Sequence, residues 1–490
     1  MPVIKKIFLL SGFIFTAAVS AFGKNFNAAY FGIKPDGKTL NTRSVQFAID
    51  YISEKGGGCL LFEAGTYLSG SVYLKSNVTL NLEEGAVLKG STNPFDYDRY
   101  QQGFSAFIFA IGQRNIGITG KGRIDGQGNK VALNVINNIE KGLINDAYTS
   151  GRASAEIRPM LIYFRNDDNV TVQNITFHNS ACWTATYEQC RHLKIDRVKV
   201  DDVYYWNEDG MDIVDCSDAT ITNNFINASD DGICLKSQTA TEACNNIYIY
   251  NNVIRSSANG IKFGTASYGG FQNIKIIKNT VYNTYRTALA LEAVDGGYIR
   301  DVYVDTLIAR NVGNLIFLRL GARSQGKTSN IDNVHISHVT GYISANKPDT
   351  GYEYEGPVED LPRNISPAII ISGLPGAPVK NIFLSDISLD HPGGGDTFYA
   401  NISLDHLNDI PELPAQYPEY SMFKELPSWG IFARHAAGLR FTNVSMKCRS
   451  EDFRVPIVLD DVAESSFLNI TNTNGHKQVY QYKTKNITIK

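Results

Sequence analysis

The stretch that decides the fold is Asn-Ile-Tyr-Ile-Tyr-Asn-Asn at residues 246–252, in which large residues alternate between polar ends. Related stretches begin at His192, Ala219 and Asn273, so four copies follow one another at three successive intervals of 27 residues. Alternation with a period of two indicates half-buried strands, and the Asn, Asp or Gly that ends each stretch favours a turn. Further copies begin at Asn77, Asn169, Ile299, Asn333, Asn381 and Leu439.

A repeat of this kind predicts an all-β solenoid. No amphipathic helix is predicted between the copies, which argues against alternating strand and helix units. One repeat cannot bury its apolar face alone, so neighbouring repeats must stack. Three short strands in each repeat, stacked in parallel, predict a right-handed parallel β-helix. A propeller is the main alternative, but its blades need roughly 40 to 45 residues each.

The ends of such a stack expose backbone edges that need covering. Residues 41–55 have helical character and are followed by three glycines, so we predict a helix that caps the first coil. Two later stretches rich in Pro and Gly, residues 345–367 and 391–429, break the repeat. Long loops that leave a regular scaffold are usually functional or disordered, and we expect these two to wall one side of a groove.

Charge and the amino terminus limit where this protein acts. With 46 basic and 49 acidic residues, the formal net charge of −3 gives no basic face for nucleic acid. Residues 1–23 have the lysines, apolar run and small residues of a signal peptide, and no later stretch is apolar enough to cross a bilayer. We therefore expect a periplasmic or extracellular protein, with residues 24–490 as a single catalytic domain.

The cysteines and histidines do not indicate a metal or a disulfide framework. The seven cysteines have no repeated short spacing, and most lie in apolar runs as expected of buried thiols, although one pair could still form a bridge. His335 and His338 are three residues apart and would face opposite sides of a strand. No metal and no cofactor are predicted.

Two acidic turns are the strongest candidates for a catalytic site. Asp209, in the stretch 204–212, lies 21 residues before Asp230 and its neighbour Asp231. That separation is close to one coil, which would place the carboxylates on adjacent strands about 4.8 Å apart. Close carboxylates raise one another's pKa, and glycoside hydrolysis needs one carboxylic acid and one carboxylate. An Asp-Gly pair alone is commonly just a turn, but two such turns one coil apart favour a site.

With these residues the chain resembles glycoside hydrolase family 28, the polygalacturonase family of the pectin-lyase-like β-helix superfamily, over nearly all of its mature length. The motifs that carry the resemblance are Tyr30-Phe-Gly-Ile-Lys-Pro-Asp-Gly-Lys, Gly56-Gly-Gly-Cys-Leu-Leu-Phe-Glu-Ala-Gly-Thr-Tyr, Leu74-Lys-Ser-Asn-Val-Thr-Leu, Ile124-Asp-Gly-Gln-Gly, Asn207-Glu-Asp-Gly, Asp230-Asp, Tyr417-Pro-Glu-Tyr-Ser-Met-Phe and Trp429-Gly-Ile-Phe-Ala-Arg-His. The resemblance implies that Asp230 is the general acid, that Asp209 and Asp231 hold and activate water, and that hydrolysis inverts the anomeric centre.

The chain departs from the family pattern in two places. The family's Gly-His-Gly corresponds to Ala258-Asn259-Gly260, and Asn259 cannot carry the charge of a histidine. The family's Arg-Ile-Lys, which contacts the substrate carboxylate, corresponds to Ala290-Leu291-Glu292. An acid in place of a cation should repel a uronate, so we do not expect an ordinary endo-polygalacturonase.

Further side chains are candidates for substrate binding. Arg286, Arg319 and Arg323 could supply a cation from another coil, because arginine pairs with carboxylates through two hydrogen bonds. Trp183, Tyr205 and Trp206 flank the acidic stretch and could stack on a sugar ring. For Trp183 we prefer packing in the core. The predicted substrate-binding set is Asn207, Asn259, Gly260, Lys236, Lys262, Glu292, Arg319, Arg323 and Trp206.

The resulting hypothesis is a monomeric hydrolase of pectic or related polysaccharides or their oligosaccharides, and the Pro-rich loops favour exo action. Two alternatives stay open. A polysaccharide lyase on the same fold would use the Asp-Asp pair for Ca²⁺, an ion that prefers carboxylate oxygens. A non-catalytic carbohydrate-binding β-helix would account for the missing histidine and cations.

Overall fold

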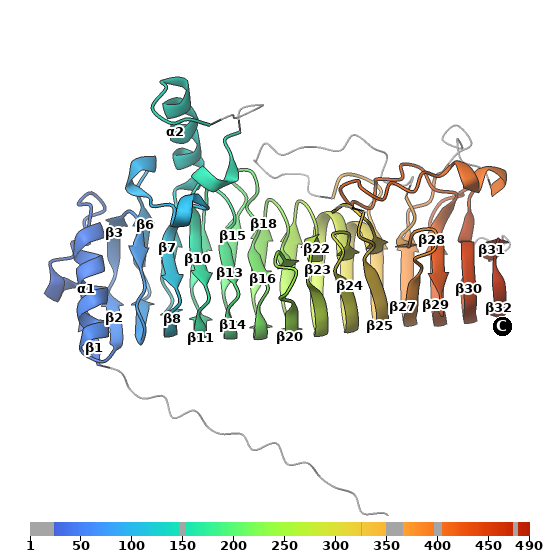
Figure 1. Cartoon of the computed structure of the whole chain (residues 1–490), viewed down its shortest axis with the longest axis horizontal. Coiled ribbons are helices and arrows are strands. Elements are labelled where there is room, and N and C mark those ends of the chain that lie inside the picture. The colour runs from blue at the N-terminus through green and yellow to red at the C-terminus, as the bar shows by residue number, and fades with distance from the viewer. Residues whose placement is uncertain (1–23, 147–151, 325, 349–365, 396–403, 474–478) are drawn as a thin grey trace, which may run out of the picture.

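Along the middle of the molecule, each strand lies parallel to the strand three places later in the chain. In the computed structural model one such series is β4 (Val72–Tyr73), β7 (Ala106–Ile111), β10 (Met160–Arg165), β13 (Ala185–Glu188), β16 (Met211–Val214), β19 (Ile233–Ser237) and β22 (Ile261–Ser267). Three strands make one coil, and the coils stack along one axis (Figure 1). The predicted right-handed parallel β-helix is confirmed.

The structure describes residues 24–146, 152–324, 326–348, 366–395, 404–473 and 479–490, so the predicted signal peptide at residues 1–23 lies outside the described residues. The second series of strands is β1 (Asn25–Asn27), β2 (Gly58–Phe62), β5 (Val78–Leu82), β8 (Arg114–Thr119), β11 (Asp168–Gln173), β14 (Arg191–Asp196), β17 (Ser217–Thr222) and β20 (Cys244–Tyr250). The third is β3 (Gly65–Ser69), β6 (Ala86–Gly90), β9 (Arg123–Asp125), β12 (Thr176–His178), β15 (Lys199–Asp202), β18 (Phe225–Ala228) and β21 (Val253–Ser256).

The later coils differ from the predicted pattern of three short strands. Here long strands pass the corners without interruption and belong to more than one series, because the parallel pairing continues through the bend. These strands are β23 (Gly270–Ala293), β24 (Tyr298–Leu320), β25 (Asn330–Ile343), β27 (Val379–His391), β29 (Arg440–Cys448) and β30 (Val455–Asn472). The shorter strands of this half are β26 (Ile369–Ser372), β28 (Ser428–Ala437), β31 (Val479–Tyr482) and β32 (Lys485–Ile489).

The asparagines of the repeat act at the corners. Asn246 and Asn273 have positive φ angles of 56° and 55°, a left-handed conformation that asparagine tolerates better than most residues. Inside the solenoid the buried side chains of Asn224, Asn252 and Asn279 form a ladder. In it, Oδ1 of Asn252 and Oδ1 of Asn279 each accept two hydrogen bonds of 2.9–3.0 Å from the preceding asparagine. The repeated asparagines therefore supply the hydrogen bonds that the turning backbone lacks.

The predicted cap is the helix α1 (Thr42–Glu54), whose apolar side chains Val45, Ala48, Ile49 and Ile52 are buried against the first coil. The absence of any helix between repeats was predicted wrongly, because α2 (Gly128–Glu140) lies between β9 and β10 and stands above the solenoid (Figure 1). It buries Val131, Ala132 and Val135. Short 3₁₀ turns are η1 (Ala28–Phe31), η2 (Pro94–Asp96), η3 (Tyr100–Gln102), η4 (Ala155–Ile157) and η6 (Leu404–Asp409). Within the described residues, every helix is too short or too polar to span a membrane.

Candidate active site

Asp209, Asp231 and Asn259 occupy the same position on three consecutive coils, just before β16, β19 and β22. The backbone N–H of Gly210 donates to the Asp231 carbonyl, and that of Gly232 donates to the Asn259 carbonyl, both at 2.8 Å. The expected placement of the two acidic turns on adjacent coils is therefore found. The parallel pairing also brings Asn259 beside Asp231, although 28 residues separate them.

A glycine follows each of these three residues because the chain is crowded there. A Cβ added to Gly210, Gly232 or Gly260 would lie 2.6, 2.4 or 2.6 Å from a branched side chain of the core, closer than carbon atoms can approach. The Asp-Gly pattern that resembled a simple turn therefore lets the strand enter tightly beneath the acidic residue. Gly260 contributes backbone to this arrangement.

Asp230 is held in a form suited to proton donation. The Asn207 side-chain amide donates to its Oδ2 at 3.3 Å, and the Asp231 backbone N–H donates to its Oδ1 at 3.0 Å. Burial, reinforced by the neighbouring Asp231 carboxylate, raises the pKa of Asp230, although Arg286, Lys262 and Lys236 oppose this. Asp230 therefore keeps its proton to a higher pH than an exposed aspartate.

Asp231 has the opposite environment. Its Oδ1 accepts from the backbone and side-chain amides of Asn259 at 3.0 and 2.9 Å, and the Lys262 ammonium lies 3.0 Å from its Oδ2. Burial favours the neutral acid, but the charges of Lys262 and Lys236 outweigh it and lower the pKa of Asp231. Adjacent aspartates with pKa values moved in opposite directions are a typical acid and base arrangement.

Asp209 forms a buried ion pair with Lys236, whose Nζ is 2.8 Å from Asp209 Oδ2 and also contacts Asp212. Burial raises the pKa of Asp209 despite this lysine. For Lys236, burial favours the neutral amine, but Asp209 and Asp212 outweigh it and raise the pKa. Asp212 was not predicted as a site residue, although its position three residues after Asp209, on the strand that follows, was a usable signal.

Trp183 also belongs to this neighbourhood. The Lys236 ammonium lies 4.0 Å from the centre of its ring, and the ring packs against Phe104 with a tilt of 35° and a centroid distance of 5.0 Å. Trp183 is only partly buried and packs beside a small outer cluster that is separate from the main core. Trp183 therefore packs against buried hydrophobic side chains, as preferred, but these belong to the outer cluster and not to the main core.

On the other side of Asp231, Lys262 and Glu292 lie under the second long loop. Lys262 is 2 % exposed and donates to the hydroxyl of Tyr417 at 3.0 Å. Burial raises the pKa of Glu292 to about 8; Lys262 opposes this rise, and Glu419 and Asp231 reinforce it. The described part of the stretch 391–429 thus reaches the acidic site, as expected of a groove wall. Residues 349–365 of the other predicted wall lie outside the described residues.

The three candidate arginines are engaged within the protein. Arg286 NH1 lies 3.0 Å from Glu419 Oε2. Arg323 makes two hydrogen bonds to Asp295, at 2.9 and 2.8 Å. Arg319 is 1 % exposed and donates to Ser372 Oγ and to the carbonyls of residues 373, 412 and 413, so it fastens the loop to the sheet. These contacts favour structural roles for Arg319 and Arg323.

Asn207 and Trp206 are held by a residue that the sequence did not single out. Arg158 is 1 % exposed and donates to Asn207 Oδ1 and to the Trp206 carbonyl, each at 2.8 Å. This fixes the Asn207 amide with its nitrogen toward Asp230. The Trp206 ring is partly buried against the core and lies under Arg152, 4.9 Å from its centre, so its contact with substrate stays a prediction.

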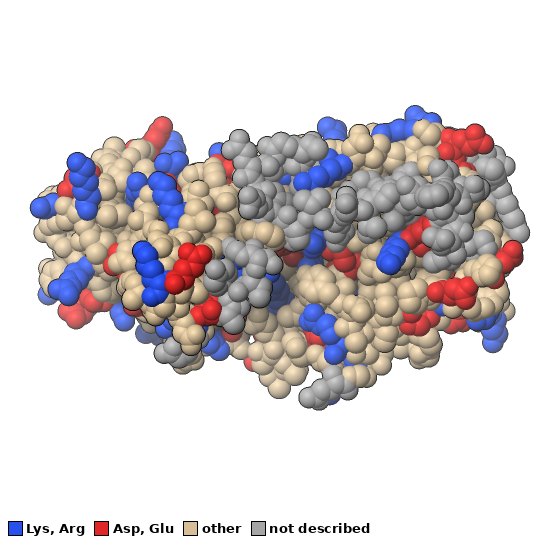
Figure 2. All heavy atoms as spheres, turned by 90° about the horizontal axis from the view of Figure 1, so that it is seen from above, with Lys and Arg blue, Asp and Glu red and all other residues tan. Residues whose placement is uncertain are grey.

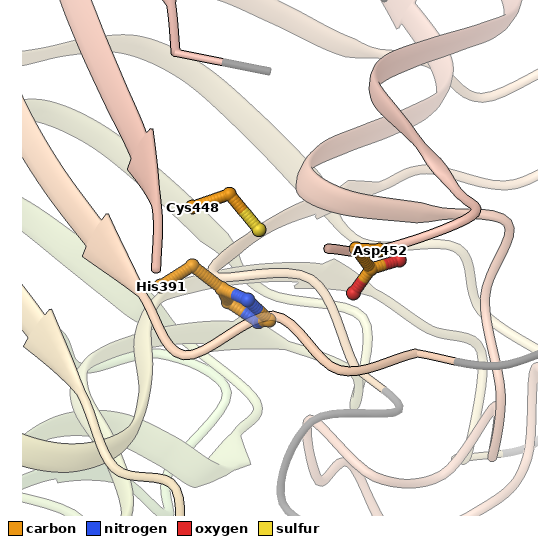
Figure 3. Close-up of side chains that lie close together, drawn as sticks. All are labelled: His391, Cys448 and Asp452. Atoms are coloured by element: carbon orange, nitrogen blue, oxygen red, sulfur yellow. The ribbon is translucent and has the colours of Figure 1, made fainter. Parts of the chain in front are cut away.

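Two groups of buried side chains have potential metal-ligand atoms within 4.8 Å of one another. In the group Asp209, Asp212 and Cys234, the ammonium of Lys236 already neutralises the carboxylates. The other group is His391, Cys448 and Asp452, which point toward one another from the ends of β27 and β29 and the following loop (Figure 3). There Arg454 donates to both Asp452 oxygens at 2.9 and 2.8 Å, and burial lowers the pKa of His391 to about 3. In each group a lysine or an arginine of the protein therefore pairs with the carboxylates.

Seen from above, acidic and basic side chains meet in a hollow near the middle of the solenoid, next to the part of the surface that is not described (Figure 2).

The seven cysteines are all free thiols, and only Cys59 is not buried, so no bridge forms between them.

Comparison with known proteins shows which proteins this chain is similar to. The sequence model of glycosyl hydrolases family 28 matches residues 61–291, which include the three aspartates. The "Probable polygalacturonase" of Vitis vinifera is 24 % identical over 412 residues, which cover 76 % of each chain. The exo-poly-alpha-D-galacturonosidase of Dickeya chrysanthemi is 26 % identical, and the match covers 54 % of this chain. This chain spans about half of that relative's length, 52 %.

A solved structure supports the same assignment at the level of the fold. The family 28 exopolygalacturonase of Yersinia enterocolitica superposes with a TM-score of 0.66 at 21 % identity, covering 95 % of this chain and 78 % of that one. The matched residues 61–291 and the shared β-helix include the part of the chain that carries the three aspartates. The chain is therefore a glycoside hydrolase, and its residues 61–291 match glycosyl hydrolases family 28.

Proposed function

We propose that this protein hydrolyses O-glycosidic bonds in pectic or related polysaccharides and oligosaccharides, with inversion at the anomeric carbon. The observation that carries the proposal is the pair of adjacent carboxyls Asp230 and Asp231: burial raises the pKa of Asp230, whereas Lys262, 3.0 Å from Asp231 Oδ2, lowers the pKa of Asp231. Inverting hydrolysis needs one acid and one base in the same site, and the relatives named above act on polygalacturonate.

In this mechanism Asp230 donates its proton to the leaving glycosidic oxygen. Asp231, ionised beside Lys262, accepts a proton from the attacking water. Asp209 lies one coil away and orients that water together with Asp231, while Lys236 compensates its charge. Asn207 keeps the Asp230 carboxyl in place through its amide. Asn259 supports Asp231 by two hydrogen bonds and needs no charge for this role.

Glu292 is the residue that we expect to decide which sugar is accepted beside the reacting bond. With a pKa of about 8, its carboxyl is neutral at pH 7 and can donate a hydrogen bond. It therefore offers a sugar hydroxyl a donor but gives a uronate no charge to bind. The repulsion of a uronate expected from the sequence would set in only above that pKa. We propose that the sugar held here is neutral.

Glu292→Lys is expected to raise kcat/KM on polygalacturonan relative to a substrate with a neutral sugar at this position. A charge-assisted hydrogen bond contributes about 1.5–3 kcal/mol, which corresponds to a selectivity change of about 10–100-fold. Initial rates on paired oligosaccharides would measure it. Glu292→Gln is the matched control, since it keeps a neutral donor and should leave the selectivity near that of the wild type. An unchanged ratio in Glu292→Lys would contradict the assignment.

Exo action fits the second loop. Tyr417 and Glu419, which the loop carries, contact Lys262 and Arg286 beside the acidic residues, so the loop narrows the groove on that side. We propose that the protein removes sugars from chain ends. A product profile dominated from the start by one short product would support this, whereas an early ladder of intermediate lengths would indicate endo action.

The first experiment is product analysis on polygalacturonan, rhamnogalacturonan and neutral glycans. Saturated products would support the hydrolase if NMR shows inversion at the anomeric carbon and if a chelator leaves the rate unchanged. Products with an unsaturated ring, whose formation stops when a chelator is added, would show that the protein is a lyase and not a hydrolase. If binding is seen but nothing is cleaved, the non-catalytic β-helix becomes the better description.

We further propose that the protein is exported and acts as a monomer, with residues 24–490 as one catalytic domain. The apolar run before residue 23 supports export. Amino-terminal sequencing of the protein recovered outside the cytoplasm and its molar mass in solution test these points.

A further inference from the structure

Directly beneath Asp209 lies a pair of carboxyl groups with no role in the mechanism above. Asp202 ends β15, and Glu208 immediately precedes Asp209 at the end of the same connection. Both side chains are 0 % exposed. Asp202 and Glu208 therefore lie at the two ends of the connection of residues 203–207, which carries Asn207.

The pair is joined to the coils on both sides. From the preceding coil, Ser180 N–H and Thr184 Oγ1 donate to Asp202 at 2.8 and 2.6 Å, and Thr184 N–H donates to the Asp209 carbonyl at 2.8 Å. From the following coil, Ser229 N–H donates to the Asp202 carbonyl at 2.8 Å, and Asp230 N–H donates to the Glu208 carbonyl at 3.4 Å. The pair thus lies at the contacts that fix the position of the coil of Asp209 relative to the coil of Asp230.

The two carboxyls meet without a cation. Glu208 Oε2 accepts from Tyr204 N–H at 2.7 Å, and hydrogen bonds from the Tyr205 backbone and the Ser229 side chain also favour the ionised form of Glu208. The carboxyl of Asp202 is a further hydrogen-bonding neighbour of Glu208. None of the ion pairs within the described residues includes Asp202 or Glu208. A hydrogen bond between two carboxyls requires that one of them keep its proton.

We propose that Asp202 and Glu208 share one proton and act as positioning residues, holding Asn207 and Asp209 in register with Asp230. This rests on the proposed hydrolase function. When the shared proton is lost, two buried negative charges face each other, and the connection that carries Asn207 and Asp209 is forced apart.

Among the surrounding ionisable groups, the charge of His178 opposes the rise in the pKa of Asp202 but does not outweigh burial. His178 on β12 faces the ring of Tyr204 at 4.9 Å and pairs with Asp201 at 3.6 Å. Asp125, on β9, adds negative charge near Tyr204. Arg158 donates its hydrogen bonds to backbone carbonyls and to the Asn207 side chain. Burial raises the pKa of Asp202 to about 7, and burial together with the charge of Asp202 raises the pKa of Glu208 well above its usual value.

The sign of the pH effect follows from these raised values. The folded state binds the shared proton more tightly than the unfolded chain, whose carboxyls titrate near pH 4. The stabilisation is complete below that pH and is lost as the pH rises through the folded-state pKa. Glu208→Gln replaces the shared proton by a permanent amide donor, so this part of the pH dependence should disappear.

The experiment compares wild type, Glu208→Gln and Glu208→Ala in kcat, KM and melting temperature across pH. Glu208→Gln should keep kcat and KM near the wild-type values at neutral pH and lose less stability toward alkaline pH. Glu208→Ala should lower kcat by about 10²-fold, the scale of a misplacement near 1 Å, with little change in KM. Asp167→Asn is the matched control, because Asp167 is a buried carboxyl at another corner whose pKa burial raises to about 7; it should change the pH dependence of stability but not kcat.

The proposal is overturned if Glu208→Gln melts with the same pH dependence as the wild type, or if folded Glu208→Ala keeps wild-type kcat. If the wild type hydrolyses no glycan, the proposed function fails, and the melting curves of wild type and Glu208→Gln alone then decide whether the proton is shared.

Discussion

Asp230→Asn is expected to lower kcat on a natural oligosaccharide by about 10²–10⁴-fold, the range that general acid catalysis contributes. The amide is nearly the same size as the carboxyl and still accepts the Asp231 N–H, so the fold should be retained. It cannot release a proton to the leaving oxygen, and this is the step for which burial holds the Asp230 proton in place.

A change of leaving group separates this explanation from a general loss of structure. A substrate with an acidic aryl alcohol as leaving group needs little protonation, so the Asp230→Asn enzyme should recover much of its rate on it. Asp231→Asn should show no such recovery, because the missing base is needed for every leaving group. Equal losses on both kinds of substrate in Asp230→Asn would contradict the assignment of Asp230 as the acid.

Lys236→Met is expected to destabilise the protein by about 3–5 kcal/mol, the cost of removing one partner from a buried ion pair. Lys236 forms ion pairs with both Asp209 and Asp212, whose side chains are 5 % and 0 % exposed. Methionine fills the space but leaves two carboxylates without a counter-charge. Urea denaturation measures the loss, and the fluorescence of Trp183, 4.0 Å from the ammonium, reports on the site itself.

The deficit of Lys236→Met should shrink as the pH falls, because protonated Asp209 and Asp212 need no counter-ion. The matched control is Lys121→Met, which removes an exposed pair with Glu84 at 4.0 Å and should cost about 1 kcal/mol or less. A Lys236→Met deficit as small as that of Lys121→Met, or one that is constant with pH, would show that the aspartates are compensated elsewhere.

Much of the fold could be predicted because its signals are local. Alternation along each strand and the asparagines at its ends report on neighbouring residues, and a coil of 27 residues repeats them often enough to be recognised. The cap at residues 41–55 was visible for the same reason. The helix α2 was missed since it interrupts the repeat only once, and the long strands β23 and β24 were missed because a strand that bends at a corner keeps its alternation.

The site divides along the same line. Sequence alone identified Asp209, Asp230 and Asp231, because coil length converts a spacing of 21 residues into adjacency. It could not reveal the ammonium groups that set their pKa values, since Lys236 and Lys262 look like ordinary strand lysines until the coils stack. The sequence thus determined which acids meet.

Only the tertiary structure decided their protonation and their enclosure. Tyr417 reaches Lys262 across 155 residues, and Arg319 fastens the covering loop at residues 412 and 413 across 93 and 94 residues. No local pattern records such contacts. Burial raises the pKa of Glu292 to about 8, which makes this expected anion a neutral acid at pH 7. The free energy of a buried charge depends on everything packed around it and not on its neighbours in the chain.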